Sequence, residues 1–187
     1  MTFVTSDLHI NHDREFLWGP RGFKSVHEMN AKEVENWNKL VKPQDDVYVL
    51  GDLALGTDID LIRDTVNSLN GRIHLIRGNH DTDAKIRLYE TMSEKIVEIT
   101  WATQIKCGKR VFHLCHYPTF TAQLDGDPER AVISLYGHLH VKDKFYEDRP
   151  YMYNVGMDAH GNMPVALEDV CFEVEEKIKE CLEVLGE

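Results

Sequence analysis

The feature that most constrains the fold is a repeated pattern in the first 140 residues of the chain. Short apolar segments are each followed, within a few residues, by aspartate, asparagine or histidine. The segments are TFVT, VYVL, IHLI, VFHLC and VISLY. They run into SDLH, GDLA, RGNHD, HYP and GHLH, in that order. The polar residues delivered in this way are Asp7, His9, Asp52, Asn79, His80, His116, His138 and His140. Apolar segments of this length are typical of buried strands. In open α/β sheets, ligands bind just beyond the carboxyl ends of the strands.

Helical patterns alternate with these segments in the first half of the chain. Ser25 and Glu28 match a capping box at the start of a helix that continues to about Val41. Further helices are expected near residues 60–69 and 83–91. Strands that alternate with helices predict a sheet of buried, parallel strands.

The second half of the chain is richer in strands. Strands are expected over residues 96–99, 103–107, 111–115, 132–136 and 151–155, with a hairpin turn at CGKR and a final helix over 167–185. An αβαβ half followed by a β-rich half predicts an α/β protein in which two sheets pack together with helices outside.

Composition limits the class of protein. With 187 residues, 42% hydrophobic and 28% charged, the chain fits one soluble domain over residues 1–187. No segment reaches the roughly 18–20 apolar residues of a membrane span, and no secretory signal is visible, so we expect a cytoplasmic protein with no membrane partner.

The four cysteines lack CxxC spacing and are expected to be free thiols. A net charge of −11 argues against tight nonspecific nucleic-acid binding, but bound cations would still admit a small phosphorylated substrate.

Each polar fragment has an ordinary structural explanation when taken alone. Asp7 could cap a turn, GNHD could be an asparagine turn, and the histidines of GHLH could lie exposed on an edge strand. Their occurrence together, at successive strand ends, is the specific signal. Two Asp, one Asn and four His provide seven nitrogen and oxygen ligands, which exceeds one tetrahedral zinc site and suits two transition-metal ions that share a carboxylate. Asp52, at the end of a central strand, is the natural bridging ligand.

The ordered set D-x-H, GD, GNHD, H and GH-x-H resembles the motifs of the calcineurin-like metallophosphoesterase superfamily, in particular its small bacterial and phage-type members. The motifs span residues 7–140, and the resemblance extends over nearly the whole chain. It implies an α/β fold, a four-layer αββα sandwich of two mixed sheets flanked by helices. It also implies two ligand sets, Asp7, His9, Asp52 and His140 for one metal ion, and Asp52, Asn79, His116 and His138 for the other.

The resemblance further implies a metal-dependent phosphoric ester hydrolase. A hydroxide that bridges two metal ions would attack phosphorus in line, and His80 would donate a proton to the leaving oxygen. Manganese is the first expectation for both ions, with Fe, Zn, Ni or Co as alternatives. Asp81 completes its motif and is assigned a structural role, while Arg21 and His12 are candidate substrate contacts.

The same resemblance bears on the substrate. Short loops and no cap domain predict an open site, which favours a phosphodiesterase acting on nucleotide-like or other small phosphodiesters over a phosphomonoesterase. The stretch GDLALGT lacks the second Asp and the Arg of the GDxxDRG motif, which argues against a protein Ser/Thr phosphatase. Two alternatives are a nuclease of the same superfamily and a non-catalytic interaction scaffold. The acidic net charge argues against the nuclease, and the complete ligand set argues against the scaffold. A homodimer is compatible with the oligomers common in this family.

Overall fold

The computed structural model describes residues 1–121 and 131–185. Its first sheet joins the three strands expected in the first half of the chain, the strand expected at 96–99, and a short strand that the sequence did not predict. This sheet, sheet I, has the order β4-β3-β2-β1-β9. Its strands are β1 (Thr2–Thr5), β2 (Asp46–Leu50), β3 (Arg72–Ile76), β4 (Ile96–Thr100) and β9 (Val165–Ala166). The first four are parallel, and β9 runs antiparallel to β1.

The second sheet, sheet II, collects the other four strands expected in the β-rich half, in the order β5-β6-β7-β8. Its strands are β5 (Ala102–Cys107), β6 (Arg110–Cys115), β7 (Ile133–Tyr136) and β8 (Met152–Asn154). The predicted CGKR hairpin joins β5 and β6, with Gly108 at φ +56° in its turn. Because β6, β7 and β8 are mutually parallel, sheet II is also mixed.

Helices complete the architecture. They are α1 (Glu15–Trp18), α2 (Val26–Leu40), α3 (Ile59–Ser68), α4 (Asp83–Glu90) and α5 (Leu167–Leu185), with short 3-10 turns η2 (Tyr146–Asp148) and η3 (Met157–Ala159). The Ser25 hydroxyl accepts a hydrogen bond from Glu28 N at 3.2 Å and caps α2, as the sequence predicts. The Glu28 carboxylate reaches one residue further back than in a standard capping box, to Lys24 N at 2.7 Å.

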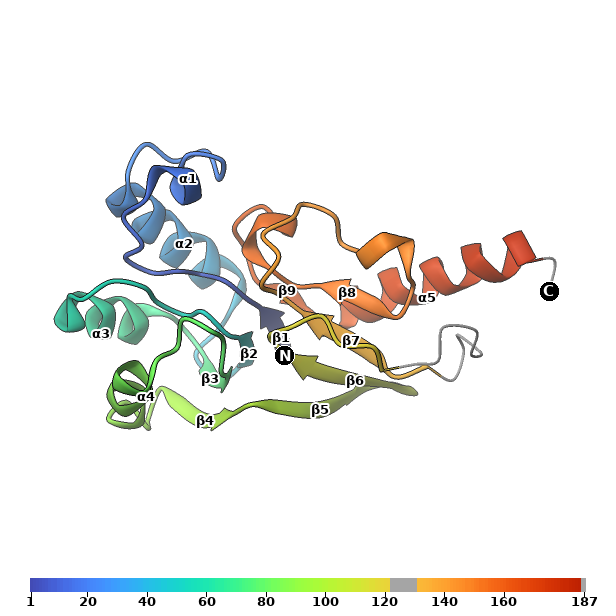
Figure 1. The fold of residues 1–187 in the computed structure, drawn as a ribbon. Helices are drawn as coiled ribbons and strands as arrows, with labels where there is room; N and C mark the ends of the chain where they lie inside the picture. Colours follow the sequence, from blue (N-terminus) through green and yellow to red (C-terminus); the bar gives the residue numbers. More distant parts are fainter. Residues whose placement is uncertain (122–130, 186–187) are drawn as a thin grey trace.

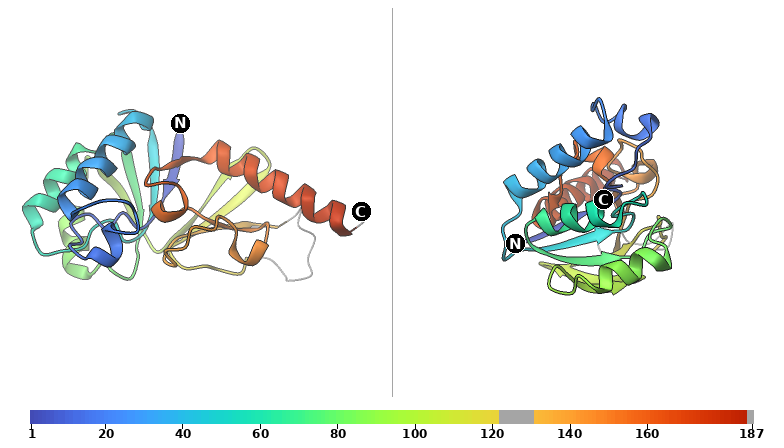
Figure 2. Two further views of the ribbon diagram at one scale, coloured as in Figure 1. Left: turned by 90° about the horizontal axis from the view of Figure 1, so that it is seen from above. Right: turned by 90° about the vertical axis from the view of Figure 1, so that its left-hand side faces the viewer.

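Two hydrophobic clusters hold the layers together. In the first, Val47, Val49 and Leu75 of sheet I pack with Trp37 of α2 and Ile62 of α3. In the second, the opposite face of sheet I packs with the strands of sheet II and with α5. Figures 1 and 2 show α2, α3 and α4 gathered on one side of sheet I and α5 lying along sheet II. The predicted α/β architecture of two mixed sheets with flanking helices is therefore confirmed.

The carboxyl ends of strands from both sheets meet at one edge. Just beyond β1, Asp7 N donates to Gly51 O at 3.1 Å, which ties this loop to the end of β2. In sheet II, Gly137 N donates to His116 O at 3.0 Å, so the segments after β6 and β7 lie side by side. His138 N then donates to the Asp7 carboxylate at 2.8 Å and joins the two sheets. This edge holds the polar fragments picked out in the sequence.

None of the helices that the structure describes has the length and apolar composition needed to cross a membrane. The four cysteines are free thiols, as expected from their spacing.

Candidate metal centre

The candidate ligands stand on an unusual backbone. Five of the seven have positive φ angles, Asp7 (60°), His9 (53°), Asp52 (53°), His138 (70°) and His140 (52°). Residues with a side chain avoid this left-handed region, and such strain persists only where surrounding contacts impose it. The loops after β1, β2 and β7 are therefore held in shapes that their own residues disfavour, as is common at functional sites.

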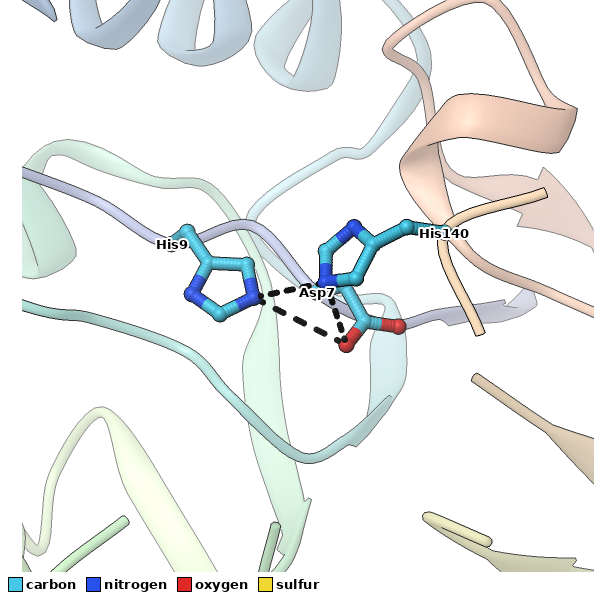
Figure 3. A group of neighbouring side chains, drawn as sticks. All are labelled: Asp7, His9 and His140. Carbon is cyan, nitrogen blue, oxygen red and sulfur yellow. Dashed lines mark hydrogen bonds and ion pairs between the residues drawn. The ribbon is translucent and has the colours of Figure 1, made fainter. Parts of the chain in front are cut away.

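The first group of donor atoms comprises Asp7 Oδ1, His9 Nε2 and His140 Nε2 (Figure 3). The two imidazole nitrogens lie 3.1 Å apart, and they lie 3.9 Å and 3.8 Å from the Asp7 oxygen. Two ligands that each lie about 2.0–2.2 Å from one ion are at most about 4.4 Å apart. All three separations satisfy that limit.

The polar atoms of this group fit a cation. Asp7 Oδ1 is buried and has no hydrogen-bond partner among the described residues. Burial, with smaller contributions from His140 and Arg21, lowers the pKa of His9 to about 2, so that its ring is neutral. His140 donates from Nδ1 to the Asp158 carboxylate at 2.9 Å, which leaves Nε2 as the atom that faces His9. An unpaired carboxylate oxygen and an imidazole nitrogen from the buried Asp7 and His9 thus converge with a nitrogen of the more exposed His140, where a positive ion would satisfy all three.

The second group comprises His116 Nε2, Asn79 Oδ1 and His138 Nδ1. The Asn79 oxygen lies 2.8 Å from the His116 nitrogen and 3.0 Å from the His138 nitrogen. His116 Nδ1 lies 2.7 Å from Leu50 O and donates to it, so Nε2 is the ring nitrogen left to face the Asn79 oxygen and to bind a metal ion. Two electron-pair donors that face each other at this distance also fit a shared cation.

Asp52 lies between the two groups. Its Oδ2 is 3.7 Å from His9 Nε2 in the first group and 3.6 Å from His116 Nε2 in the second. Donor atoms of Asp7, Asp52 and His116 also lie within 4.8 Å of one another. The structure therefore brings all seven predicted ligands to one place, with the Asp52 carboxylate at its centre.

Two glycines permit this close approach. A Cβ atom added at Gly78 would clash with Asp52 Oδ1, and one added at Gly137 would clash with Ser6 Oγ and Asp7 Oδ2. Glycine is required at both positions because the backbone passes directly against a candidate ligand.

His80 lies at the open side of the group. Its side chain is 45% exposed, and its Nε2 is 4.0 Å from Asp52 Oδ2. Its backbone N–H donates to Asp52 Oδ1 at 2.8 Å, which fixes its position relative to the candidate bridging carboxylate. Asp81, next in sequence, is buried, and its Oδ2 accepts the N–H groups of Asp52 and Gly78 at 2.8 Å and 2.9 Å. Asp81 thus holds the loops after β2 and β3 together.

Comparison with known proteins places the chain in a family. The model of the calcineurin-like phosphoesterase superfamily domain matches residues 1–177. The chain belongs to the calcineurin-like phosphoesterase superfamily. This confirms the resemblance seen in the motifs, and it supports a metal-dependent phosphoesterase in general terms.

One relative by sequence and one solved structure are similar to this superfamily member over most of its length, and a second relative is similar over less than half. It is 31% identical to an uncharacterized protein of Methanocaldococcus jannaschii over 174 residues, which cover 89% of this chain and 86% of the relative. It is 37% identical over 83 residues to the gene 66 protein of Mycobacterium phage L5, covering 43% and 39% of the two chains. Its fold is similar to the crystal structure of a protein of unknown function from Aquifex aeolicus, with a TM-score of 0.68, 21% identity, and coverage of 91% and 97%.

In this phosphoesterase-family protein, Arg21 does not lie where it could make the substrate contact that was predicted for it. Its side chain is 1% exposed, and all five of its N–H donors meet protein acceptors. These acceptors are Asp7 O, Leu8 O, the Glu33 carboxylate and both oxygens of the Asp158 carboxylate, at 2.7–3.2 Å. The prediction of a substrate contact is therefore wrong for Arg21, because no donor is left to reach a phosphate. Arg21 instead fixes the loop that carries Asp7.

Asp158 is a site residue that the sequence reasoning missed. Its carboxylate receives Arg21 on both oxygens and His140 on Oδ2. Burial opposes its ionisation, but the hydrogen bonds from His140 and Arg21 outweigh burial and hold the pKa of Asp158 well below its usual range. A signal was available in the sequence, since Asp158 follows β8 just as the other polar residues follow their strands.

His12, the other candidate substrate contact, lies beside the first donor group. Its ring centroid is 5.3 Å from that of His9, and both residues line a pocket of about 510 Å³. His80 and His140 line the same pocket. The structure thus places His12 in a pocket beside the candidate metal centre, and its contact with substrate stays a prediction.

Proposed function

We propose that this protein is a binuclear-metal phosphoesterase that hydrolyses small, nucleotide-like phosphodiesters. The observation that carries the proposal is the position of Asp52 Oδ2, within 3.7 Å of a donor nitrogen from each of two groups. A carboxylate so placed is suited to join two ions about 3.5–4 Å apart. The oxygen and nitrogen donor set, without thiolate, suits Mn and also Fe, Zn, Ni or Co.

The residues present divide into two ligand sets around that carboxylate. Asp7, His9, Asp52 and His140 would hold one ion, and Asp52, Asn79, His116 and His138 would hold the other. When bound, such a pair of ions lowers the pKa of water to generate a nucleophile and stabilises charge on the phosphoryl oxygens. Proton transfer to the leaving group would be carried out by the side chains around the ions.

Among these side chains, His80 is placed to move a proton. It is half exposed at the open side of the group, and its Nε2 lies 4.0 Å from Oδ2 of the carboxylate that would join the two ions. We assign it the role of general acid, donating to the oxygen of the leaving alcohol as the phosphorus–oxygen bond breaks. Since the side chains of His80 and His140 are 45% and 36% exposed, the site reaches the surface, which is compatible with a diester as well as a monoester.

A screen of metals against substrates tests the proposal. Purified protein would be stripped with chelator, reloaded separately with Mn, Ni, Zn or Mg, and assayed with bis(p-nitrophenyl) phosphate, p-nitrophenyl phosphate, a cyclic nucleotide and single-stranded DNA. We expect hydrolysis that depends on a transition metal and is fastest on a small diester. Absence of hydrolysis in every combination would favour a non-catalytic scaffold and contradict the proposal. Preference for single-stranded DNA would favour a nuclease.

Two variants test the assigned roles. Asp52→Asn should abolish loading of the metal pair and activity together, since one carboxylate serves both groups. His80→Ala should keep both ions and lose about 100-fold or more in kcat, the usual effect of removing a general acid. Asp64→Asn on α3 and His27→Ala on α2, both exposed, are matched controls that should change neither quantity. Loss of metal in His80→Ala, or an unchanged rate, would refute the role of His80.

A further inference from the structure

The pocket beside the first donor group has two chemically different walls. One wall is made by His9, His80, His140 and Asp158, which belong to the candidate centre or contact it. The other is made by Phe16, Leu17, Pro20 and Leu55, with His12 between the two walls. Ligand pockets commonly combine an apolar lining with a few polar groups, and about 510 Å³ is within their usual range of roughly 300–1,000 Å³.

The apolar wall is firmly attached to the fold. Leu17 of α1 is 6% exposed and packs with Val26 and Met29 of α2 in a small cluster of its own. Just after α1, Arg21 binds the backbone oxygens of Asp7 and Leu8. Contacts at α1 and just after it therefore fix this wall, so the pocket exists before any substrate binds.

Phe16 is exposed within this ordered wall. Its side chain is 72% exposed, while its neighbour Leu17 is buried. Its ring lies edge-on to His12, with centroids 5.6 Å apart and an interplanar angle of 86°. A single exposed phenylalanine is common on protein surfaces. What distinguishes Phe16 is its position, on a preformed pocket that opens onto His80 and the first donor group.

The position of His80 indicates which part of a substrate enters this pocket. In the proposed reaction, oxygen from water attacks phosphorus, the phosphorus–oxygen bond to the alcohol breaks, and the proton from His80 goes to the departing oxygen. Since His80 lines the pocket, a departing oxygen that receives its proton would face the pocket. The carbon skeleton of the alcohol would then extend toward Phe16, Pro20 and Leu55.

We propose that this pocket is the leaving-group subsite, that it takes a planar aromatic ring carried by the leaving alcohol, and that Phe16 and His12 bind the ring. The inference rests on the proposed phosphoesterase function and narrows its substrates to diesters with an aryl or nucleoside leaving group. Aromatic rings prefer edge-to-face or offset stacking, and both Phe16 and His12 offer rings at this wall. Stacking of a base on an aromatic side chain typically strengthens binding about tenfold or more.

The experiment compares leaving groups of similar basicity. Metal-loaded protein would be assayed with benzyl methyl phosphate, isobutyl methyl phosphate and the methyl ester of a nucleoside 5′-phosphate, and the released alcohol would be identified. Binding of benzylphosphonate and methylphosphonate, which cannot be hydrolysed, would be measured by calorimetry. We expect benzyl alcohol rather than methanol as product, and tighter binding of the benzyl compound. The nucleoside ester shows whether a nucleobase or a simple aryl ring is preferred.

Variants of Phe16 separate recognition of the ring from catalysis. Phe16→Ala should reduce benzylphosphonate affinity and kcat/KM for the benzyl ester about tenfold, with less than a twofold change for methylphosphonate and the isobutyl ester. Phe16→Tyr, which keeps the ring, should restore both values. Phe172→Ala on α5 is the matched control, since Phe172 is 67% exposed and is not among the residues that line the pocket.

The possible failures are distinguishable. If esters are hydrolysed but the benzyl and isobutyl esters react equally, or Phe16→Ala affects them equally, the subsite is wrong and the phosphoesterase proposal stands. If no ester is hydrolysed with any metal, both proposals are overturned.

Discussion

The Asp158 carboxylate accepts a hydrogen bond from His140 Nδ1 at 2.9 Å, and this contact decides which nitrogen of His140 faces the candidate metal centre. A histidine that donates from one ring nitrogen to a carboxylate presents the other nitrogen as a ligand, in a fixed orientation. Arg21 in turn binds both oxygens of Asp158, at 3.0 Å and 2.9 Å. The chain Arg21–Asp158–His140 therefore links a buried cation to a candidate ligand.

Asp158→Ala should weaken metal binding about 10–100-fold, the usual cost of losing such a partner of a ligating histidine. Asp158→Asn should have a smaller effect, since its amide oxygen still accepts one of the hydrogen bonds. Calorimetric titration of metal into metal-free protein measures the change. Asp60→Ala, an exposed carboxylate on α3, serves as the control. Equal affinity in Asp158→Ala and wild type would show that His140 does not depend on Asp158.

Gly137→Ala should disrupt the first donor group. The new methyl group would clash with Ser6 Oγ and with Asp7 Oδ2, the oxygen that accepts His138 N. With a centre of two ions, as proposed, we expect metal analysis after dialysis to show the loss of one ion per chain. In Gly108→Ala no atom lies within 4 Å of the new methyl group, although φ is +56°. That control should cost about 1–2 kcal/mol of stability and leave the metal content unchanged. Full metal content in Gly137→Ala would contradict the inference that the backbone at Gly137 lies too close to Asp7 to admit a side chain.

Local sequence patterns predicted the candidate centre because its members share one kind of position. Asp7, Asp52, Asn79, His116 and His138 each come within three residues of the end of a short apolar strand. The parallel arrangement of the strands then brings these ends together. His9 and His140 come four residues after their strands, and so does Asp158 after β8, so a window of four residues would have found Asp158 as well. The left-handed backbone of the ligands could not be foreseen, since contacts from distant loops impose it on residues that disfavour it.

Arg21 shows where the sequence was uninformative. An arginine next to Gly22 in a polar segment is typical of an exposed loop, because arginine is rarely buried without partners. Its partners Glu33 and Asp158 lie 12 and 137 residues away, and no local pattern connects them to it. α1 and β9 were missed for a different reason: with 4 and 2 residues, they are too short to show periodicity.

Arg21→Met should destabilise the fold rather than change substrate affinity. The substitution leaves the buried Glu33 carboxylate without its cation, and breaking a buried ion pair costs about 3–5 kcal/mol. Urea unfolding of the metal-free protein measures this loss. Arg63→Met, which removes the exposed pair between Arg63 and Asp60, should change stability by less than about 0.5 kcal/mol. A stable Arg21→Met variant with a raised KM would instead restore the role of a substrate contact.

Glu173 makes the attachment of α5 to sheet II dependent on pH. Its Oε2 accepts the Tyr153 hydroxyl at 2.8 Å, and its carboxylate binds Lys144 at 2.7 Å. Burial raises the pKa of Glu173, but the hydrogen bonds from Lys144 and Tyr153 outweigh burial and hold it below its ordinary value. A carboxyl group whose pKa is depressed by folding adds stability above its unfolded pKa of about 4.3. That stability is lost as the pH falls through the folded pKa.

Glu173→Gln should therefore destabilise the protein by about 1 kcal/mol at pH 6–7, and this difference from wild type should shrink toward zero as the pH falls below about 4. Urea unfolding at a series of pH values between about 3 and 7 checks both the size and the pH window. Glu176→Gln on the same helix removes only an exposed pair with Lys179, so its difference from wild type should stay small throughout. If the Glu173→Gln difference stayed constant down to pH 3, the lost stability would come from packing of the side chain, because packing does not depend on pH. The contribution of a carboxylate that accepts hydrogen bonds from Tyr153 and Lys144 must instead disappear when the carboxylate is protonated.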